Sequence, residues 1–364
     1  MGDQTVVSER EQKILGIIET ARGKRAKFRD AHITMSHGAG GKATQTLIEG
    51  LFVPAFAGDA LAEMADAGAV CVDAAELAFT TDSYVVKPLR FPGGSIGELA
   101  VNGTVNDLAV SAARPLALLV TLVIEEGIDT ETLAAEVRAI GEAARRAGVE
   151  VVGGDTKVVE HGKADGMYIT TAGLGRVDPR ARCAASEVRA GDQVLLSGPI
   201  GDHGITILLA RGEIELEAEL RSDTRSVYPM VERLLAAAPG GVRWMRDPTR
   251  GGVATALNEL ARDSRLGIVL CEEQIPVREP VRGACELLGL DPLHIANEGQ
   301  FLAVVAPAQA EAALRAVRSV AGGEEAVILG EVRAEPARTV LAAAAYGGTR
   351  VVDMLVGDPL PRIC

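Results

Sequence analysis

The sequence lacks several features that would each assign it to a class of protein. Aromatic residues are few, with 6 Phe, 4 Tyr and 1 Trp among 364 residues, so we expect a core of Ala, Val, Leu and Ile. No run approaches the roughly 18 apolar residues that a membrane span needs. The polar N-terminus has no apolar segment typical of a secretory signal. We therefore expect a protein that is not bound to a membrane and lies in the cytoplasm.

Cysteines and basic residues are also too few, or too scattered, for several kinds of site. The five cysteines are widely spaced and form no CxxC pair, which argues against a disulfide framework or a thiolate zinc site. Lys and Arg number 37 against 50 Asp and Glu, and the net charge of −13 argues against a nucleic-acid-binding surface. The acidic excess raises the question of whether some carboxylates are metal ligands.

The chain does contain helix and strand patterns that alternate in two series. A length of 364 residues suggests two domains, and a polar stretch with Pro and Gly at 176–191 separates the series. The clearest helix is 130–147, where apolar residues recur on one face and Gly148 follows as a C-cap. We expect an N-terminal extension at 1–30, one domain at 31–178, a second domain at 190–345 and a tail at 346–364.

Each series has its own expected elements. In the first, apolar or β-branched runs predict strands at 78–86, 116–124, 149–152 and 167–174, and helical patterns cover 96–112 and 130–147. In the second, we expect strands at 193–197, 242–246, 267–272, 300–306, 326–333 and 339–344, and helices at 204–211, 226–237, 251–263, 278–288 and 308–320.

Two glycine-rich segments of the first domain suggest anion binding. Gly40 and Gly41, followed by Lys42, offer backbone N–H groups beside a mobile cation, although the spacing is not that of a Walker loop. The segment 153–157 (GGDTK) directly follows the predicted strand 149–152 and brings a carboxylate, a hydroxyl and an amine together. Such a corner suits phosphate and metal. The first segment is also consistent with a plain glycine turn before a helix.

Some carboxylates stand where solvation alone does not explain them. Asp82 ends an apolar run, Asp107 follows Asn106 inside an apolar helix pattern, and Asp155 follows a glycine pair. Burying such groups costs free energy unless they are paired or ligated. One such aspartate is more often structural than functional, but several that converge would form an ATP–Mg²⁺ site without a P-loop.

The second domain has two further candidates. Thr249, Arg250, Gly251 and Gly252 lie between a predicted strand and a predicted helix, where helix N-terminal amides and an arginine can bind an anion. Glu298 precedes the predicted strand that begins at residue 300 and is a candidate general base. An N-cap turn with a surface arginine, and a turn carboxylate, are the structural alternatives.

The chain ends in DPLPRIC, with a thiol at its last position, Cys364. Prolines at alternate positions stiffen and extend a segment, so this tail could enter a cleft. Chance explains a terminal cysteine poorly, but the residues alone do not say what the thiol does.

Taken in order, these motifs resemble those of the HypE family, the carbamoyl dehydratases of [NiFe]-hydrogenase maturation. The similar segments are SHGAGGK, TTDSYVV, GELAVNGTVNDLA, GGDTKVV, RDPTRGGVATALNE, ANEG and the terminal PRIC, and together they span about residues 31–364. The motifs up to GGDTK are shared with a superfamily that includes aminoimidazole ribonucleotide synthetase, selenophosphate synthetase and thiamine-monophosphate kinase. The terminal PRIC is specific to the HypE family.

The resemblance implies a two-domain α/β (α+β) chain. The N-terminal sheets of two copies would pair into a dimeric β-barrel, the second domain would be a sandwich-like α/β unit, and the tail would be flexible. ATP would lie at the domain and subunit junction. The implied magnesium ligands are Asp82, Asp107 and Asp155, and the implied ATP-binding residues are Gly40, Gly41, Lys42, Asn106, Thr156, Thr249, Arg250, Gly251 and Gly252.

The resemblance also implies a reaction and partners. A carbamoyltransferase would load a carboxamide onto Cys364, and ATP would drive its dehydration to a thiocyanate, whose cyanide passes to a hydrogenase maturation complex. Phosphorylating the amide oxygen turns a poor leaving group into phosphate. Lys157 and Glu298 are then the implied acid/base residues, acting on a tail that must swing in and out.

Two other functions remain open at this point. A sibling ATP enzyme, such as a selenophosphate synthetase or a thiamine-phosphate kinase, would share most of the motifs. A selenophosphate synthetase should carry a cysteine in its N-terminal glycine loop, and residues 31–45 contain none. A non-enzymatic nucleotide-binding scaffold would bind ATP without turnover and leave Cys364 unmodified.

Overall fold

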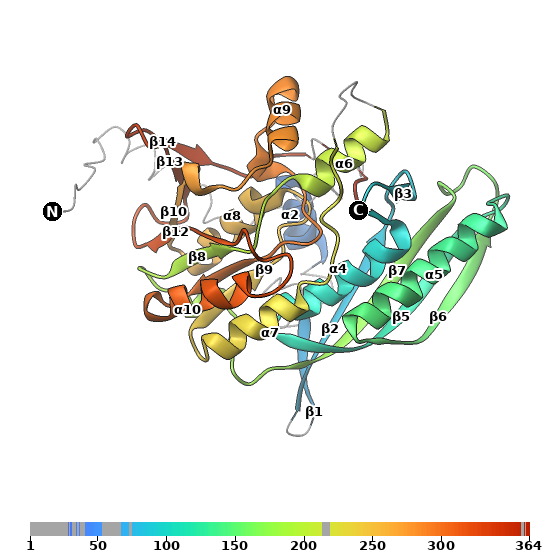
Figure 1. The fold of residues 1–364 in the computed structure, drawn as a ribbon, viewed down its shortest axis with the longest axis horizontal. Helices are drawn as coiled ribbons and strands as arrows, with labels where there is room; N and C mark the ends of the chain where they lie inside the picture. The colour runs from blue at the N-terminus through green and yellow to red at the C-terminus, as the bar shows by residue number, and fades with distance from the viewer. Residues whose placement is uncertain are drawn as a thin grey trace.

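Two β-sheets with helices packed on them form the body of the protein (Figure 1). The computed structural model describes residues 28, 30, 34, 36, 41–52, 67–72, 75–212, 219–357, 360 and 362–364. Most of the expected extension at 1–30 and the candidate Gly40 lie outside these residues. Within the described residues, no helix has both the length and the apolar character needed to cross a bilayer.

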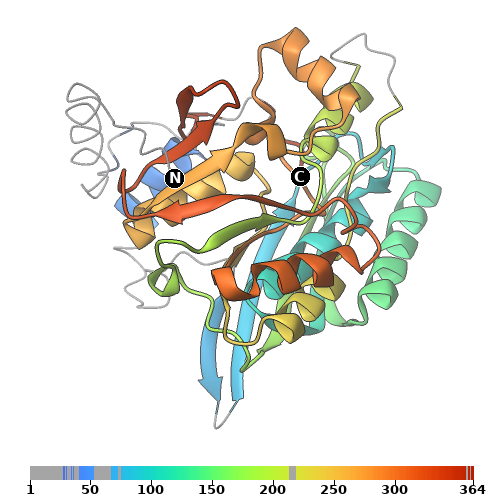
Figure 2. The ribbon, with the colours of Figure 1, turned by 60° about the vertical axis from the view of Figure 1, so that its left-hand side comes forward.

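The first sheet has five strands in the order β1-β2-β7-β5-β6. Its strands β5 and β6 run parallel, and the other neighbouring pairs are antiparallel. The strands are β1 (Gly68–Val72), β2 (Ala75–Tyr84), β5 (Ala113–Glu125), β6 (Glu150–Val159) and β7 (Met167–Val177), with a small ribbon of β3 (Arg90–Phe91) and β4 (Gly94–Ser95) beside them. The β1–β2 hairpin extends beyond the rest of the molecule (Figure 2).

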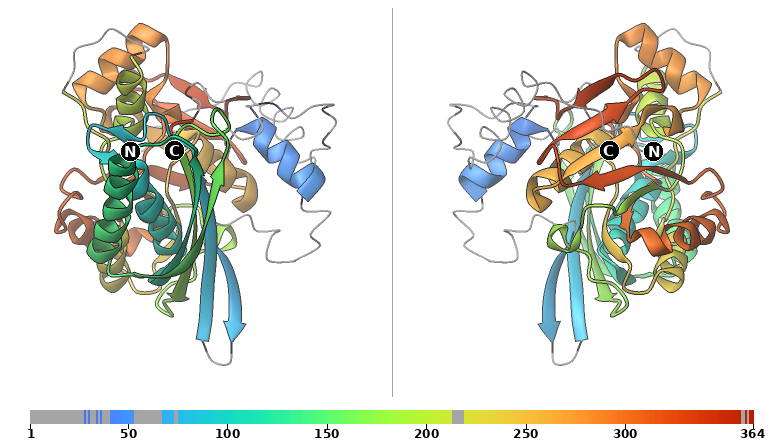
Figure 3. Two further views of the ribbon diagram at one scale, coloured as in Figure 1. Left: turned by 90° about the vertical axis from the view of Figure 1, so that its right-hand side faces the viewer. Right: turned by 90° about the vertical axis from the view of Figure 1, so that its left-hand side faces the viewer.

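Two helices, α4 (Ile96–Val110) and α5 (Thr130–Ala147), cover one face of this sheet (Figures 1 and 3). The α5 helix begins at Asp129, whose carboxylate accepts a hydrogen bond from the Thr132 N–H (3.0 Å), and ends at Gly148 with φ 69°. The α4 helix is buried almost all round because it lies between the sheet, α5 and the second domain. Polar side chains on α4 therefore need partners within the protein.

The other face of the first sheet carries no helix among the described residues. We call it the open face; side chains on it include Phe79, Ser83, Leu119, Thr121 and Thr170. Ser83 Oγ and Thr170 Oγ1 are 2.9 Å apart across β2 and β7, which confirms that this row shares one side. Phe79 and Leu119 are 48% and 47% exposed, an unusual degree for large apolar residues in the middle of a sheet.

The second sheet has seven strands in the order β14-β13-β10-β12-β8-β11-β9. Helix α8 packs on one face, and α7 and α10 pack on the other, so alternate strand residues fill two separate cores. The elements are β8 (Gln193–Leu196), α6 (Asp202–Ala210), α7 (Tyr228–Ala237), β9 (Val242–Arg246), α8 (Gly252–Ser264), β10 (Gly267–Cys271), α9 (Glu279–Leu288), β11 (Leu302–Val305), α10 (Pro307–Arg318), β12 (Val327–Arg333), β13 (Val340–Ala343) and β14 (Thr349–Val352).

Most of the expected helices and strands are confirmed, some to the residue, as at 130–147 and 242–246. One local prediction is wrong: the segment 153–157 is not a corner after a strand but lies inside β6. Gly154 explains this, because a Cβ there would lie 1.8 Å from the Val120 carbonyl oxygen. The glycine permits close pairing of β6 with β5 rather than a turn.

The structure also contains elements that the sequence did not predict. Helix α2 (Lys42–Leu47) continues as a π-helical turn at Ile48–Phe52 (Figure 3), and this segment lies beside α8, where Glu49 pairs with Arg262 at 3.0 Å. The tail forms the edge strand β14, and its end returns to the first domain between α6 and β3 (Figure 1).

Candidate functional site

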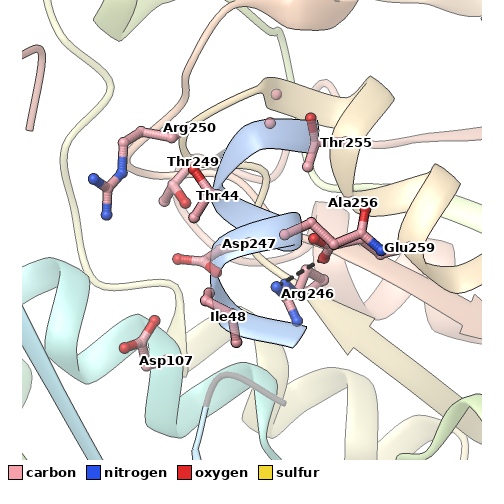
Figure 4. A pocket seen from close by; sticks show the side chains of 13 residues that line it. Thr44, Ile48, Asp107, Arg246, Asp247, Thr249, Arg250, Thr255, Ala256 and Glu259 are labelled. Carbon is pink, nitrogen blue, oxygen red and sulfur yellow. Dashed lines mark hydrogen bonds and ion pairs between the residues drawn. The ribbon is translucent and has the colours of Figure 1, made fainter. Parts of the chain in front are cut away.

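A pocket of about 220 Å³ lies where α2, α4, the β9–α8 loop and α8 meet. Figure 4 shows its side chains converging from these segments, with a dashed line between Arg246 and Glu259. The lining residues are Gly41, Thr44, Gln45, Ile48, Asp107, Arg246, Asp247, Thr249, Arg250, Gly252, Thr255, Ala256 and Glu259. Five of the sequence candidates, Gly41, Asp107, Thr249, Arg250 and Gly252, are therefore brought together.

The glycines at the start of α8 have a definite structural role. Gly251 and Gly252 have φ of 75° and 61°, a region that side chains with a Cβ rarely adopt. A Cβ on Gly252 would lie 2.5 Å from the Leu293 carbonyl oxygen. The Gly252 N–H donates to the Thr249 carbonyl within this turn at 2.9 Å. Gly252 also lines the pocket, so the pocket borders the N-terminus of α8, a position that suits an anion such as a phosphate.

The first domain carries two candidate aspartates, of which Asp107 lines the pocket and Asp82 does not. Asp107 lies on α4 and accepts a hydrogen bond from Thr80 Oγ1 at 2.7 Å, and Asp82 lies on β2 on the same, helix-covered face. Tyr84 lies two residues after Asp82 on β2. Burial, followed by the charges of Asp82, Asp107 and Glu298, raises the pKa of the Tyr84 hydroxyl well above its usual value. Tyr84 is a core residue at 1% exposure and is not part of the pocket lining.

Glu298 is buried, at 3% exposure, and its Oε1 atom has no hydrogen-bond partner within the described part of the chain. Its backbone is fixed: the Glu298 and Gly299 N–H groups donate to the two Asp223 oxygens at 3.0 and 3.1 Å. Burial, followed by the charges of Asp247, Asp223 and Asp82, raises the pKa of Glu298 well above its usual range. A buried carboxyl with a raised pKa on a fixed backbone is compatible with the general-base role that the resemblance implies.

Asn106, an implied ATP-binding residue, makes hydrogen bonds within the protein. It is 1% exposed, and its amide nitrogen donates to the carbonyl oxygens of Arg225 (2.9 Å) and Glu298 (3.2 Å). Its oxygen accepts from the Val227 N–H at 2.8 Å. Both amide hydrogens and the oxygen are thus used inside the protein, and Asn106 does not line the pocket. It ties α4 to the second domain.

The candidates on β6 lie elsewhere. Asp155 pairs in register with Thr121 of β5, and Thr121 with Thr170 of β7, so Asp155 projects from the open face. Lys157 lies on the same side, and its Nζ is 2.6 Å from the Asp155 carboxylate. That contact, with the Thr156 N–H, lowers the pKa of Asp155. Within one chain, Asp155, Thr156 and Lys157 do not meet the pocket or Glu298.

Lys42 also lies outside the pocket lining. Its Nζ is 2.9 Å from Asp353, and its backbone N–H donates to the Leu355 carbonyl at 3.0 Å. A Cβ on Gly41 would lie 2.4 Å from the same carbonyl oxygen, so a glycine is needed where α2 meets the tail. The start of α2 is thereby fastened to the segment that leads to Cys364.

The end of the tail is docked rather than extended into solvent. Cys364 is 8% exposed, and Leu360 and Ile363 are buried in the core beneath α6. The Val85 N–H donates to the Cys364 carbonyl oxygen at 3.0 Å. Val85 directly follows Tyr84, so the terminal residue lies at the end of β2 that also carries Asp82. The docked thiol and the acidic site therefore share one end of the first sheet.

Sequence reasoning missed several residues of this region. Asp247 and Glu259 line the pocket, and Thr255 has a buried hydroxyl without a hydrogen-bond partner in the described residues. Asp223 holds the Glu298 backbone. Asp247 could have been found, because it stands inside the same RDPTRGG motif as Thr249. Nothing in the sequence around Asp223 (RSDTRS) marks it as a site residue.

Comparison with known families places the chain among the AIR synthase related proteins. Residues 64–177 match the AIR synthase related protein N-terminal domain, and residues 189–342 match the corresponding C-terminal domain. A curated relative, the carbamoyl dehydratase HypE of Bradyrhizobium diazoefficiens, is 49% identical over 341 residues, which cover 94% of this chain and 99% of the relative.

Comparison with solved structures also finds HypE proteins. One chain of a crystal structure of a HypE–HypF complex is 42% identical, with a TM-score of 0.81, and the match covers 85% of this chain and 99% of that one. A crystal structure of the hydrogenase maturation protein HypE in complex with ATP is 42% identical, with a TM-score of 0.76, and the match covers 92% of this chain and all of that one.

Proposed function

Because the chain belongs to the HypE family of carbamoyl dehydratases, we propose that it dehydrates a carboxamide carried on its own Cys364 to a thiocyanate. It is an ATP-dependent enzyme of hydrogenase maturation, as that family membership implies. The observation that carries the proposal is the docked tail: the C-terminal residue lies at the end of β2, beside Asp82 and Tyr84. No external substrate has to be bound to bring that thiol there.

We assign the nucleotide to the pocket beside α8. The N-terminus of α8, with Thr249 and Arg250, suits the phosphates, and α2 contributes Thr44 and Gln45 to the pocket lining. Gly41 joins this set, and the other implied glycine, Gly40, lies outside the described residues. We leave Asn106 and Lys42 outside it, because their polar atoms are engaged elsewhere.

The residues present also fit Mg²⁺. The described residues contain no group of three or more His, Cys, Asp or Glu side chains that could hold a metal by themselves. Mg²⁺ does not need such a group, since it is usually bound by one or two carboxylates together with phosphate oxygens and water. Asp107 and Asp247, both in the pocket lining, with Asp82 nearby, are the carboxylates that would hold it. The ion would supply charge neutralisation on the transferred phosphoryl group.

The reaction is a dehydration without a change of oxidation state. The carboxamide oxygen attacks the γ-phosphorus of ATP, ADP leaves, and the nitrogen loses one proton to give an S-linked O-phosphoimidate. Loss of phosphate together with the second nitrogen proton then forms the C≡N bond of the thiocyanate. Glu298 is the base within the chain that we propose for these protons, since its desolvated carboxyl binds a proton tightly.

We propose that Asp155, Thr156 and Lys157 act in the site of a second copy. Asp155 and Lys157 project from the open face, where Phe79 and Leu119 are also exposed, and Thr156 lies between them on β6 with its side chain on the opposite face. Two open faces that pack together would bury these apolar side chains and form the dimeric barrel expected from the family resemblance. An exposed ion pair at that junction can then serve the neighbouring copy's ATP and Glu298, which it cannot reach in its own chain.

Two partners complete the proposal. A carbamoyltransferase, for which HypF is the candidate from the solved HypE–HypF complex, would load Cys364. A hydrogenase maturation complex would accept the cyanide, in the cytoplasm. Both require Cys364 to leave its buried place, so the docked tail is one of two positions that the cycle needs.

A mass measurement tests the reaction. The protein would be carbamoylated by its transferase, given Mg²⁺ and ATP, and the C-terminal peptide weighed. We expect the peptide to lose one water, in proportion to the phosphate released. A peptide that keeps its carboxamide mass while ATP is consumed would refute the proposal. Cys364→Ala is the control, and it should bind ATP with unchanged affinity but carry no carboxamide.

A further inference from the structure

The docked tail is held by side chains that the ATP pocket does not use. His203 of α6 is fully buried, and its Nε2 lies 2.6 Å from the Ile363 carbonyl oxygen. Since a carbonyl can only accept, Nε2 must carry the hydrogen, and Nδ1 then accepts from Ser222 Oγ at 2.8 Å. Burial lowers the pKa of His203, so the neutral ring suits this arrangement. The Ile363 carbonyl oxygen thus accepts a hydrogen bond from His203 Nε2, a donor that Ser222 holds in place.

A second contact binds the side chain of Arg362, the arginine of the tail. Arg362 has a φ of 58°, a conformation that non-glycine residues rarely adopt. Its guanidinium pairs with the Asp165 carboxylate and donates to the Val85 carbonyl at 3.3 Å. Lys87 also pairs with Asp165, at 2.9 Å. Hydrogen bonds from Lys87 and Arg362 lower the pKa of Asp165 to about 2, so this carboxylate is charged whenever the tail is docked at neutral pH.

Arg211 lies between these two contacts and binds backbone carbonyls on both sides. Its guanidinium donates to the Arg362 carbonyl oxygen, and its Nε donates to the Lys87 carbonyl oxygen at 2.7 Å. The backbone of the tail is therefore bound at residues 362, 363 and 364, by Arg211, His203 and the Val85 N–H in turn. None of these three residues lines the nucleotide pocket.

From this geometry we infer that Asp165 and His203 are positioning residues that recognise the tail, Asp165 by the Arg362 side chain and His203 by the Ile363 carbonyl. They form a peptide-binding subsite for a C-terminal segment with arginine two residues before the end. The inference rests on the proposed role of Cys364 as carrier of the reacting group. A substrate on the same chain needs only weak contacts, because its effective concentration is high. Weak contacts also let the tail leave.

Alkylation of Cys364 tests the subsite without any turnover. Asp165→Asn, Arg362→Gln and the double variant would be treated briefly with a maleimide, and the modified fraction of the C-terminal peptide measured by mass. We expect each single variant to raise the alkylation rate of Cys364 roughly 5- to 20-fold, the effect of losing one charge-assisted pair. In the double variant the two effects should combine to much less than their full sum in free energy, because both substitutions remove the shared Asp165–Arg362 pair.

Matched controls separate positioning from general destabilisation. Asp178→Asn breaks a comparable Asp–Arg pair with Arg180, away from the tail, and should leave Cys364 alkylation unchanged. For His203 we compare His203→Gln, which keeps a donor, with His203→Phe; only the latter should expose the thiol. If Asp165→Asn leaves alkylation at the wild-type rate, or if its effect adds to that of Arg362→Gln, the inference is wrong.

A second measurement links the subsite to the reaction. In single turnover with carbamoylated protein and saturating ATP, Asp165→Asn should slow loss of water by roughly the same factor, with the Kd of ATP unchanged. Unaltered turnover in a variant whose tail is exposed would also overturn the inference. If even the wild-type carboxamide is never dehydrated, the proposed function fails, whereas the alkylation data still decide whether Asp165 and Arg362 hold the tail.

Discussion

Asp82 and Asp155 belong to the same five-stranded sheet and project from its opposite faces. Asp82 pairs in register with Thr171, which is buried under α4, whereas Asp155 continues the open row of Ser83, Thr170 and Thr121. Three strand spacings of about 4.8 Å also separate β2 from β6. The two carboxylates therefore cannot share a metal or a nucleotide in one chain, and any joint role needs a second copy.

Mixed dimers test this arrangement. Lys157→Ala and Glu298→Gln should each abolish dehydration. If the site combines Glu298 of one copy with Lys157 of the other, a mixed dimer keeps one intact site. Random pairing of equal amounts should then restore about one quarter of the wild-type activity. As a control, Lys157→Ala mixed with Asp155→Ala should restore nothing, because both residues come from the same β6. No recovery in the first mixture would contradict a shared site.

Glu298→Gln tests the buried base. The substitution keeps the shape of the side chain but removes its ability to take a proton, so single-turnover dehydration should slow by roughly 10²-fold or more. Since burial raises the pKa of Glu298, the wild-type rate should rise with pH as this carboxyl ionises, and that rise should vanish in the variant. Glu311→Gln on the exposed face of α10 is the control. An unchanged pH profile in Glu298→Gln would assign the base elsewhere.

Gly252→Ala tests the turn that opens α8. An added Cβ would lie 2.5 Å from the Leu293 carbonyl oxygen and 2.7 Å from that of Ile295, at a φ of 61°. We expect the free energy of unfolding to fall by roughly 2 kcal/mol or more and the affinity for ATP to fall with it. Gly283→Ala in α9 is the matched control, since nothing lies within 4 Å of its Cβ position. That variant should be as stable as the wild type or slightly more so. Equal behaviour of the two variants in urea unfolding would refute the argument.

Asp202→Asn tests a buried charge at the start of α6. Burial, and then the charge of Asp223, raises the pKa of Asp202 to about 6. The folded state therefore holds a proton that the unfolded state has lost between about pH 4 and pH 6, and this contribution to stability grows as the pH falls through that window. Two pK units correspond to roughly 3 kcal/mol.

The variant should lack that contribution, so its stability relative to wild type should decrease between pH 6 and pH 4 in urea titrations. Asp178→Asn is a control of opposite sign, because hydrogen bonds from Arg180 lower the pKa of Asp178. Its contribution is lost only as the pH falls below about 4. A constant difference between Asp202→Asn and wild type over the window would show that Asp202 stays ionised.

The sequence by itself determined the two-series α/β organisation, most helices and strands, and the motifs at Gly41, Asp107 and Thr249–Gly252. These are local patterns: the spacing of apolar residues, caps such as Asp129 and Gly148, and glycines where the backbone needs a positive φ. A pattern of that kind involves only a few neighbouring residues, so it can be recognised without knowing which elements pack against it.

Only the tertiary structure decided which candidates meet. Whether Asp155 faces the helices or the open side depends on its pairing with Thr121 and on a bulge between β5 and β6, and a shift of one residue would reverse it. The contacts of Asp165 with Arg362 and of His203 with Ile363 join residues more than 150 positions apart. Such contacts leave no local trace, because they arise from how whole elements pack and not from neighbouring residues.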